Sequence, residues 1–253
     1  MIRNGFKSLV LAVGFATIIP VPSLTTVDDA ALRRSMGFFP LAGGLLGLGL
    51  WGAMWAGTHL MPRFPAALAV VALYGLVTGG LHLDGLADTF DAFGSRHPPA
   101  RALAVMKDSR IGTMGAVAVI LVLMGKVIAF SYMPRGGPSP WVVVPVLART
   151  AVVWSMAWVP AARPEGLGAL FARRLSRGTV VGATILGLVA AFALLTWQLA
   201  LFLMLLSVGA TALWVRLIRR RLGGATGDTY GALLELVEWA GFLALTGGWG
   251  YGH

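Results

Sequence analysis

The chain has 253 residues, of which 57% are hydrophobic and 12% are charged, and its mean hydropathy of +0.80 predicts an integral membrane protein with an all-α, polytopic helical bundle. Because it contains no cysteine, disulfides, iron–sulfur clusters and thiolate zinc sites are excluded. Its formal net charge of +10 lies mostly beside apolar segments, which favours anionic lipid headgroups rather than nucleic acid as the partner of the basic residues.

The first segment places Arg3 and Lys7 before an apolar run that ends at Pro20 and Pro22. This pattern resembles a signal peptide, but no small-residue cleavage pattern follows it. The run is also short for crossing about 30 Å of hydrocarbon. We therefore expect residues 1–35 to be retained as an interfacial or re-entrant segment, although a true crossing by residues 5–20 stays open.

Apolar stretches long enough to cross a bilayer follow in chain order. They predict about seven transmembrane helices in a single membrane domain covering residues 1–253. The predicted spans are Met36–Met61, Phe64–Leu83, Gly112–Met133, Trp141–Ala161, two crossings within Thr179–Leu217 that are broken near Trp197 and Gln198, and Thr229–Gly250. Small residues on the helix faces would permit a homo-oligomer without requiring one.

Alternating crossings place nearly all the flanking Lys and Arg residues on one side of the membrane, in segments 3–34, 96–110, 163–177 and 216–221. Only Arg63 and Arg135 fall on the other side. The positive-inside rule assigns the basic side to the cytoplasm. Two acidic regions, residues 84–111 and 218–238, then both begin at the cytoplasmic face.

Three aspartates, Asp84, Asp88 and Asp91, stand at spacings of four and three at the end of an apolar stretch. On a helix these positions fall within an arc of about 60°, so the three carboxylates would point the same way and repel one another. Magnesium typically uses a few carboxylates together with substrate phosphates. The pattern therefore predicts a magnesium site and a catalytic segment over residues 84–111, with a merely solvated helix end as the alternative.

Lys107 and Arg110 lie three residues apart just before the next apolar span, with Asp108 between them. Basic side chains at the start of a helix favour phosphoryl oxygens, so we expect both cations to bind substrate phosphate. Asp108 would complete the metal site or cap the helix. The alternative for the two cations is an ordinary role in membrane orientation.

A glycine-rich segment, Gly223–Asp228, leads into a helix that carries Glu235 and Glu238. Asp228 and Glu235 are two turns apart, so they share one helix face at about 10 Å along the axis. The turn could hold phosphate through backbone N–H groups, which makes Thr226, Asp228 and Glu235 candidate site residues. The alternative is a tight turn between two spans with Asp228 as the helix N-cap.

Two cations, Lys126 and Arg149, lie near the middles of their spans, where an unpaired charge is costly. They would pair with acids or with substrate phosphate, and a purely structural pairing with Glu235 or Glu238 is the alternative. His82, beside the first aspartate, would join the metal or phosphate site or simply be accommodated at the interface.

Three motifs together resemble the adenosylcobinamide-GDP ribazoletransferase family, also called cobalamin synthases. They are Gly80–Thr89, Met106–Gly112, and Thr226–Asp228 followed by Gly231, Ala232 and Glu235. The segments Phe15–Pro22 and Phe39–Leu41 are also similar to this family, so the resemblance covers essentially the whole chain.

The resemblance implies a magnesium-dependent phosphotransferase of a bacterial or archaeal cell inner membrane, which completes vitamin B12 by joining α-ribazole or its 5′-phosphate to adenosylcobinamide-GDP with release of GMP. One or two Mg2+ ions would sit on Asp84, Asp88 and Asp91, and Asp91 or Asp88 would take the proton of the attacking hydroxyl. The remaining implied site residues are His82, Lys107, Asp108, Arg110, Arg149, Thr226, Asp228 and Glu235.

Other functions stay open from the sequence. The Asp-Gly element also resembles CDP-alcohol phosphotransferases that act on lipids, but Ala87-Asp88 stands where those enzymes carry Ala-Arg. Intramembrane acids with basic partners are also found in ion-coupled transporters, although no inverted repeat is visible here. A purely structural membrane subunit is the third alternative.

Overall fold

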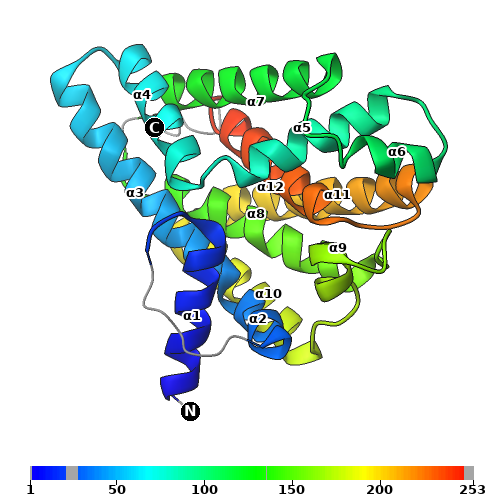
Figure 1. The fold of residues 1–253 in the computed structure, drawn as a ribbon. Coiled ribbons are helices and arrows are strands. Elements are labelled where there is room, and N and C mark those ends of the chain that lie inside the picture. Colours follow the sequence, from blue (N-terminus) through cyan, green and yellow to red (C-terminus); the bar gives the residue numbers. More distant parts are fainter. Residues whose placement is uncertain (1, 21–27, 135, 248–253) are drawn as a thin grey trace.

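The computed structural model describes residues 2–20, 28–134 and 136–247, and within these ranges the regular structure is entirely helical (Figure 1). The predicted all-α class is thereby confirmed. Pro22, Arg135 and the predicted end of the last span at Gly250 lie outside the described residues.

Twelve α-helices and one 3-10 turn make up the described chain. Their bounds are α1 Ile2–Ala16, α2 Asp29–Ser35, η1 Met36–Phe38, α3 Phe39–Leu60, α4 Arg63–Val77, α5 Leu81–Gly94, α6 Pro99–Val105, α7 Thr113–Tyr132, α8 Ser139–Trp158, α9 Gly166–Phe171, α10 Arg177–Leu194, α11 Trp197–Leu222 and α12 Gly227–Ala244.

Five stretches of the described residues are helical, long and apolar enough to cross a membrane, and a sixth is obtained if α4 and α5 count as one bent span. The polytopic bundle is therefore confirmed, with five or six candidate spans among the described residues where the sequence predicts about seven. The helix that is left out is α12, because Asp228, Glu235 and Glu238 interrupt its apolar sequence. The five are α3 together with α2 and η1, then α7, α8, α10 and α11.

The predicted span Phe64–Leu83 ends earlier than its apolar sequence does. α4 stops at Val77, and α5 leaves it at an angle of 89°. Two consecutive glycines make this bend, since Gly79 and Gly80 have φ values of 65° and 68°, a left-handed conformation that costs little only without a β-carbon. The first aspartates therefore lie on a separate helix that starts at the bend.

Other predicted boundaries agree with the structure. The long apolar stretch Thr179–Leu217 is divided into α10 and α11 at Leu195 and Thr196, close to the predicted break. The first apolar helix, over Gly5–Ala16, stays too short to qualify as a span, as expected for a short amino-terminal segment.

Two helices, α8 and α12, lie at the centre of the bundle. α8 packs against α3, α10, α11 and α12, while α12 also packs against α5, α7 and α11. Of the apolar sequence of α8, 83% is buried inside the protein, compared with 22% for α10. α8 therefore needs neighbours on all sides, whereas α10 leaves most of its surface to lipid.

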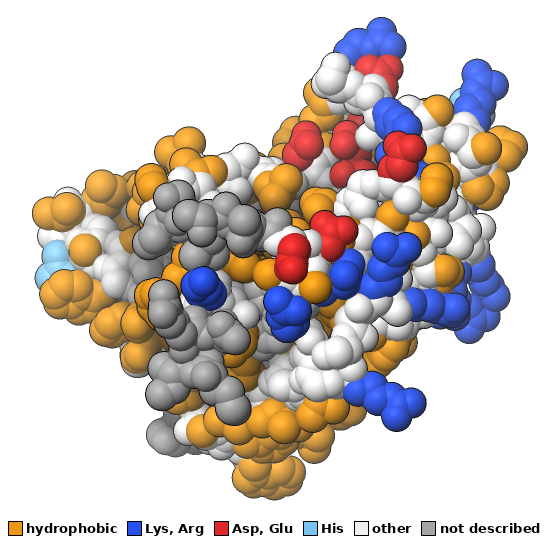
Figure 2. Space-filling view, turned by 60° about the horizontal axis from the view of Figure 1, so that its bottom comes forward, with side chains coloured by type: hydrophobic (Ala, Val, Ile, Leu, Met, Phe, Trp, Pro, Cys, Tyr) orange, Lys and Arg blue, Asp and Glu red, His pale blue; other side chains and the backbone are white. Residues whose placement is uncertain are grey.

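Charged side chains gather on one face of the molecule. Figure 2 shows acidic and basic groups close together on this face, with hydrophobic side chains around its edges. Short α6 and α9 lie toward the same end of the bundle as α5 (Figure 1). The acidic motifs are thus held at one end of an otherwise apolar protein.

Candidate active site

The two acidic motifs meet where α5 crosses the start of α12. A β-carbon at Gly85 would lie 2.7 Å from the main-chain oxygen of Asp228, and one at Gly231 would lie 3.1 Å from the Cα atom of His82. Such distances exclude or crowd any side chain larger than hydrogen, so the glycines let the two backbones touch. This contact brings residues separated by more than a hundred positions into one site.

Three carboxylates lie close together at this crossing, namely those of Asp84, Asp88 and Asp228. Burial and, to a smaller extent, the neighbouring charges of Asp84, Asp228 and Asp91 together raise the pKa of Asp88 to about 6, whereas Arg163 acts in the opposite direction. Asp84 is exposed, and Asp88 and Asp228 are half-buried. An anionic cluster of this kind, open on one side, attracts a cation.

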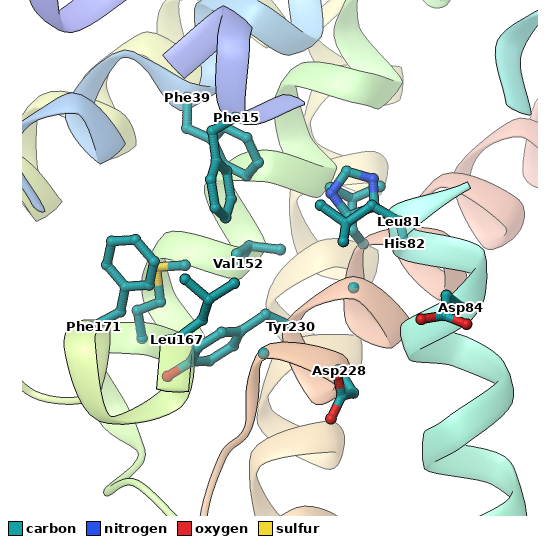
Figure 3. Close-up of a pocket in the computed structure, with 14 residues that line it drawn as sticks. Phe15, Phe39, Leu81, His82, Asp84, Val152, Leu167, Phe171, Asp228 and Tyr230 are labelled. Carbon is teal, nitrogen blue, oxygen red and sulfur yellow. The ribbon is translucent and has the colours of Figure 1, made fainter. Parts of the chain in front are cut away.

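The carboxylates at this crossing supply part of the oxygen ligands that magnesium needs. Among the described residues, no group of three or more His, Asp and Glu side chains is arranged to hold a metal ion by itself. Magnesium, however, commonly binds through one or two carboxylates and completes its shell with water and substrate phosphates. Asp84 and Asp228, on adjoining helices beside one cavity (Figure 3), fit that partial role.

Asp91 has a different environment from its two neighbours. Its carboxylate accepts hydrogen bonds from the backbone N–H groups of Gly112 at 2.7 Å and Gly115 at 2.8 Å. These donors lie at the start of α7, where N–H groups lack helical partners. Both oxygens are thus engaged, which favours a positioning role over the metal-ligand role that the spacing predicts. Asp91 therefore caps the start of α7, a role that the sequence offered as one alternative for Asp108.

The segment before α7 carries an exposed ion pair. Arg110 donates to Asp108 through Nη2 at 2.7 Å and through Nε at 3.0 Å. These hydrogen bonds lower the pKa of Asp108 to about 2. Lys107 is exposed as well. Arg110 and Asp108 thus bind each other in this structure. The phosphate-binding role of Lys107 and Arg110 and the metal-binding role of Asp108 stay predictions.

The glycine-rich segment forms a tight turn, which was the alternative to a phosphate cradle. Gly223 ends α11 with φ at 77°, and a β-carbon at Gly224 would lie 2.5 Å from the oxygen of Pro160. Thr226, and not Asp228, is the N-cap of α12, with reciprocal hydrogen bonds to Thr229. The N-cap alternative for Asp228 is therefore wrong, and its carboxylate accepts one hydrogen bond, from the Thr226 hydroxyl at 3.2 Å.

Arg163 was not among the residues predicted for the site. Its loop is fixed to the turn before α12, because Ala162 N–H donates to the oxygen of Ala225 at 2.9 Å and Ala225 N–H donates to that of Pro160 at 2.8 Å. Its Nη2 donates to the oxygen of Leu103 at 3.2 Å, and its Nε is buried with no partner among the described residues. In the sequence, Arg163 could not be distinguished from the other basic residues that flank apolar segments and set the orientation in the membrane.

Glu235 and Arg149 belong to a closed network inside the bundle. Lys126 Nζ lies 2.7 Å from Glu235 and 2.8 Å from Glu238, and Arg149 Nη1 lies 2.5 Å from Glu238. Tyr74 donates to Glu238 at 2.6 Å and accepts from Arg149 at 3.1 Å. Two cations neutralise two anions away from solvent. The structural pairing predicted as an alternative is confirmed, and these contacts favour it over substrate binding by Arg149.

His82 is buried in the first turn of α5, where Arg149, Glu238 and Lys126 are the charged groups that act on its ring. It lines a pocket that Asp84 and Asp228 also line (Figure 3). Tyr230 and Phe171 line the same pocket, and nothing in the periodicity of the sequence distinguished them from ordinary core residues.

Curated relatives cover almost the whole chain. A protein named adenosylcobinamide-GDP ribazoletransferase in Herpetosiphon aurantiacus is 43% identical, with 92% of this chain and 93% of the relative covered. Proteins of the same name in Brevibacillus brevis and Pseudomonas entomophila are 38% and 39% identical, with 94% and 93% of this chain and 97% and 96% of the relatives covered. No solved structure matches the fold.

A family model gives the same result from a different comparison. The model described as cobalamin-5-phosphate synthase matches residues 8–246, which include every helix that contributes to the carboxylate site. The resemblance seen in the three sequence motifs is confirmed. The chain belongs to the cobalamin-5-phosphate synthase family.

Proposed function

We propose that this protein joins α-ribazole, or its 5′-phosphate, to adenosylcobinamide-GDP and releases GMP. The observation that carries the proposal is the crossing of α5 and α12, where Gly85 touches the backbone of Asp228 and gathers carboxylates beside a cavity. Relatives that bear the transferase name over nearly their full length support the choice of substrates. The site suits transfer at a diphosphate, in which catalysis is mainly alignment and charge neutralisation.

Asp84 and Asp228 would hold magnesium in this site. When bound there, magnesium would neutralise the charge of the diphosphate and of the departing GMP phosphate. Asp88 would then be free for proton transfer. Its raised pKa of about 6 suits a general base, because a base works best when its pKa lies near the operating pH.

The proposed reaction, in which ribazole replaces GMP on adenosylcobinamide-GDP, defines which bonds form and break. The ribazole oxygen forms a bond to the cobinamide-side phosphorus, the bond between that phosphorus and the bridging oxygen breaks, and GMP leaves with the bridging oxygen. Asp88 accepts the proton of the attacking hydroxyl. Arg163, fixed beside Asp88 and Asp228, would bind phosphoryl oxygens, for which its buried and unpartnered Nε supplies a donor.

A release assay tests this function. Purified protein is given adenosylcobinamide-GDP, ribazole and magnesium, and GMP is measured with each component omitted in turn. Asp84→Asn and Asp228→Asn should each lower turnover by at least about 100-fold, whereas Asp29→Asn, an exposed aspartate in the first turn of α2, should behave as wild type. Full turnover without ribazole, or with a lipid alcohol in its place, would refute the assignment.

The proposed site faces the cytoplasm, since the positive-inside rule places its basic surroundings there. The chain has no cysteine, so single cysteines can report the side of the membrane. Ser109→Cys should react with an impermeant maleimide only from the cytoplasmic side, and His59→Cys only from the other side. The reverse pattern would invert the orientation. A homo-oligomer stays a prediction of the small-residue helix faces.

A further inference from the structure

An aromatic cavity adjoins the carboxylate site. It has a volume of about 70 Å³ and is lined by residues of α1, α3, α5, α8, α9 and α12. Phe15 stands at its wall, with ring centroids 5.8 Å from Phe39 and 5.9 Å from Phe171, both in edge-to-face contact. Three phenylalanines from distant parts of the chain thus surround one space (Figure 3).

Two polar atoms in this apolar lining have no partner among the described residues. They are Nδ1 of His82 and the hydroxyl of Tyr230, whose residues are 5% and 4% exposed. A buried donor or acceptor left unpaired costs about 1–3 kcal/mol, so such atoms are usually met by a ligand or by water. Figure 3 shows Tyr230 reaching toward Leu167 and Phe171, while His82 lies across the pocket on the helix of Asp84.

We propose that this cavity binds the aromatic base of ribazole, with the Tyr230 hydroxyl donating a hydrogen bond to the free ring nitrogen of the benzimidazole. The inference rests on the function proposed above. A methylated benzimidazole is a flat apolar bicycle with a single ring-nitrogen acceptor, which matches a phenylalanine-lined wall carrying few polar atoms. Aromatic side chains that pack on a base contribute about 1–3 kcal/mol of binding free energy.

The other aromatic group of the reaction fits this cavity less well. Guanine carries several donors and acceptors, for which the wall of Phe15, Phe39 and Phe171 offers no partner, and the two carboxylates that could pair with its N–H groups, Asp84 and Asp228, are assigned to magnesium above. The base position also agrees with the chemistry, because Asp84 and Asp228 line the same cavity. A base seated there would direct its ribose toward the carboxylates, where the attacking hydroxyl is needed.

The decisive comparison uses two nucleosides. Ribazole and its dimethylindole analogue differ only in the ring nitrogen, which the analogue replaces by C–H. Wild-type protein should prefer ribazole by about tenfold or more in kcat/KM, and Tyr230→Phe should reduce that preference to nearly one, with an unchanged KM for adenosylcobinamide-GDP. Tyr132→Phe, which changes an exposed tyrosine outside the cavity, should keep the wild-type preference.

A second variant tests the apolar wall. Phe171→Leu should raise the KM for ribazole several-fold more than that for adenosylcobinamide-GDP, whereas Phe130→Leu, in the core away from the cavity, should not separate the two values. If Tyr230→Phe keeps the full preference for ribazole, or if Phe171→Leu affects only adenosylcobinamide-GDP, the cavity does not hold the base.

Direct binding separates this inference from the proposed function. Ribazole binding is titrated by calorimetry without the second substrate. If Tyr230→Phe weakens ribazole binding about tenfold, the base site is supported. Absence of GMP release by wild-type protein would refute the transferase assignment but would leave this binding result, and the base site, unaffected. Equal binding of ribazole by wild type and Tyr230→Phe would overturn the inference.

Discussion

A β-carbon at Gly85 would lie 2.7 Å from the main-chain oxygen and 2.9 Å from the Cα atom of Asp228. Because both of these atoms belong to backbone, a side chain at Gly85 can be accommodated only if α5 and α12 move apart. The carboxylates that we assign to the diphosphate site lie on these two helices. The spacing of the site therefore depends on a residue that has no functional group.

Gly85→Ala is expected to separate the two helices and to lower turnover by about 100-fold, the cost of a shift near 1 Å in a catalytic site. Gly52→Ala is the matched control, since a β-carbon at Gly52, also inside a helix, meets nothing within 4 Å. GMP release and the amount of folded protein are measured for both. Equal activity of the two variants would mean that the close contact does not set the site.

Asp91→Asn should leave the magnesium dependence of turnover unchanged while lowering the thermal unfolding temperature. The amide keeps only one of the two acceptors that receive the N–H groups of Gly112 and Gly115. Asp84→Asn serves as the comparison and should raise the magnesium concentration needed for half-maximal rate or abolish turnover. If Asp91→Asn raised the magnesium requirement as much as Asp84→Asn does, Asp91 would instead be a magnesium ligand.

Asp88 gives the reaction a pH dependence. Since its pKa is raised to about 6, the carboxylate can accept a proton above that pH and is protonated below it. Magnesium on Asp84 and Asp228 would neutralise two of the charges that raise this pKa, so with saturating magnesium kcat/KM should fall about tenfold per pH unit from a pH somewhat below about 6. Free ribazole is the suitable substrate, because it carries no phosphate that titrates in this range. A profile that stays flat down to about pH 4, near the ordinary pKa of an aspartate, would remove Asp88 as the base.

The buried network should be sensitive to the loss of one charge. Lys126→Met leaves Glu235 and Glu238 facing each other with Arg149 as their remaining cation, and this should destabilise the protein by about 3–5 kcal/mol. The double variant Lys126→Met with Glu235→Gln restores neutrality and should recover much of that loss. The free energy of unfolding is measured in detergent for the single and the double variant. A single variant as stable as wild type would contradict the ion-paired network.

Much of the fold could be predicted because apolar length is a local property. A helix that crosses lipid satisfies its own backbone and needs a continuous apolar sequence, so α7, α8 and the division of α10 from α11 are visible in the sequence. The bend before α5 was missed because hydropathy continues through it. Only the left-handed conformation of Gly79 and Gly80 ends α4 at Val77.

The sequence by itself determined the membrane class, the resemblance to one family and the two acidic motifs, because composition, motif order and helical spacing are written along the chain. Only the tertiary structure decided which acids face one cavity and which are engaged elsewhere. Asp91 and Asp88 share a motif, yet the first accepts two backbone hydrogen bonds from α7 while the second lies near Asp228. Such differences depend on contacts between distant segments, which no spacing within one helix can specify.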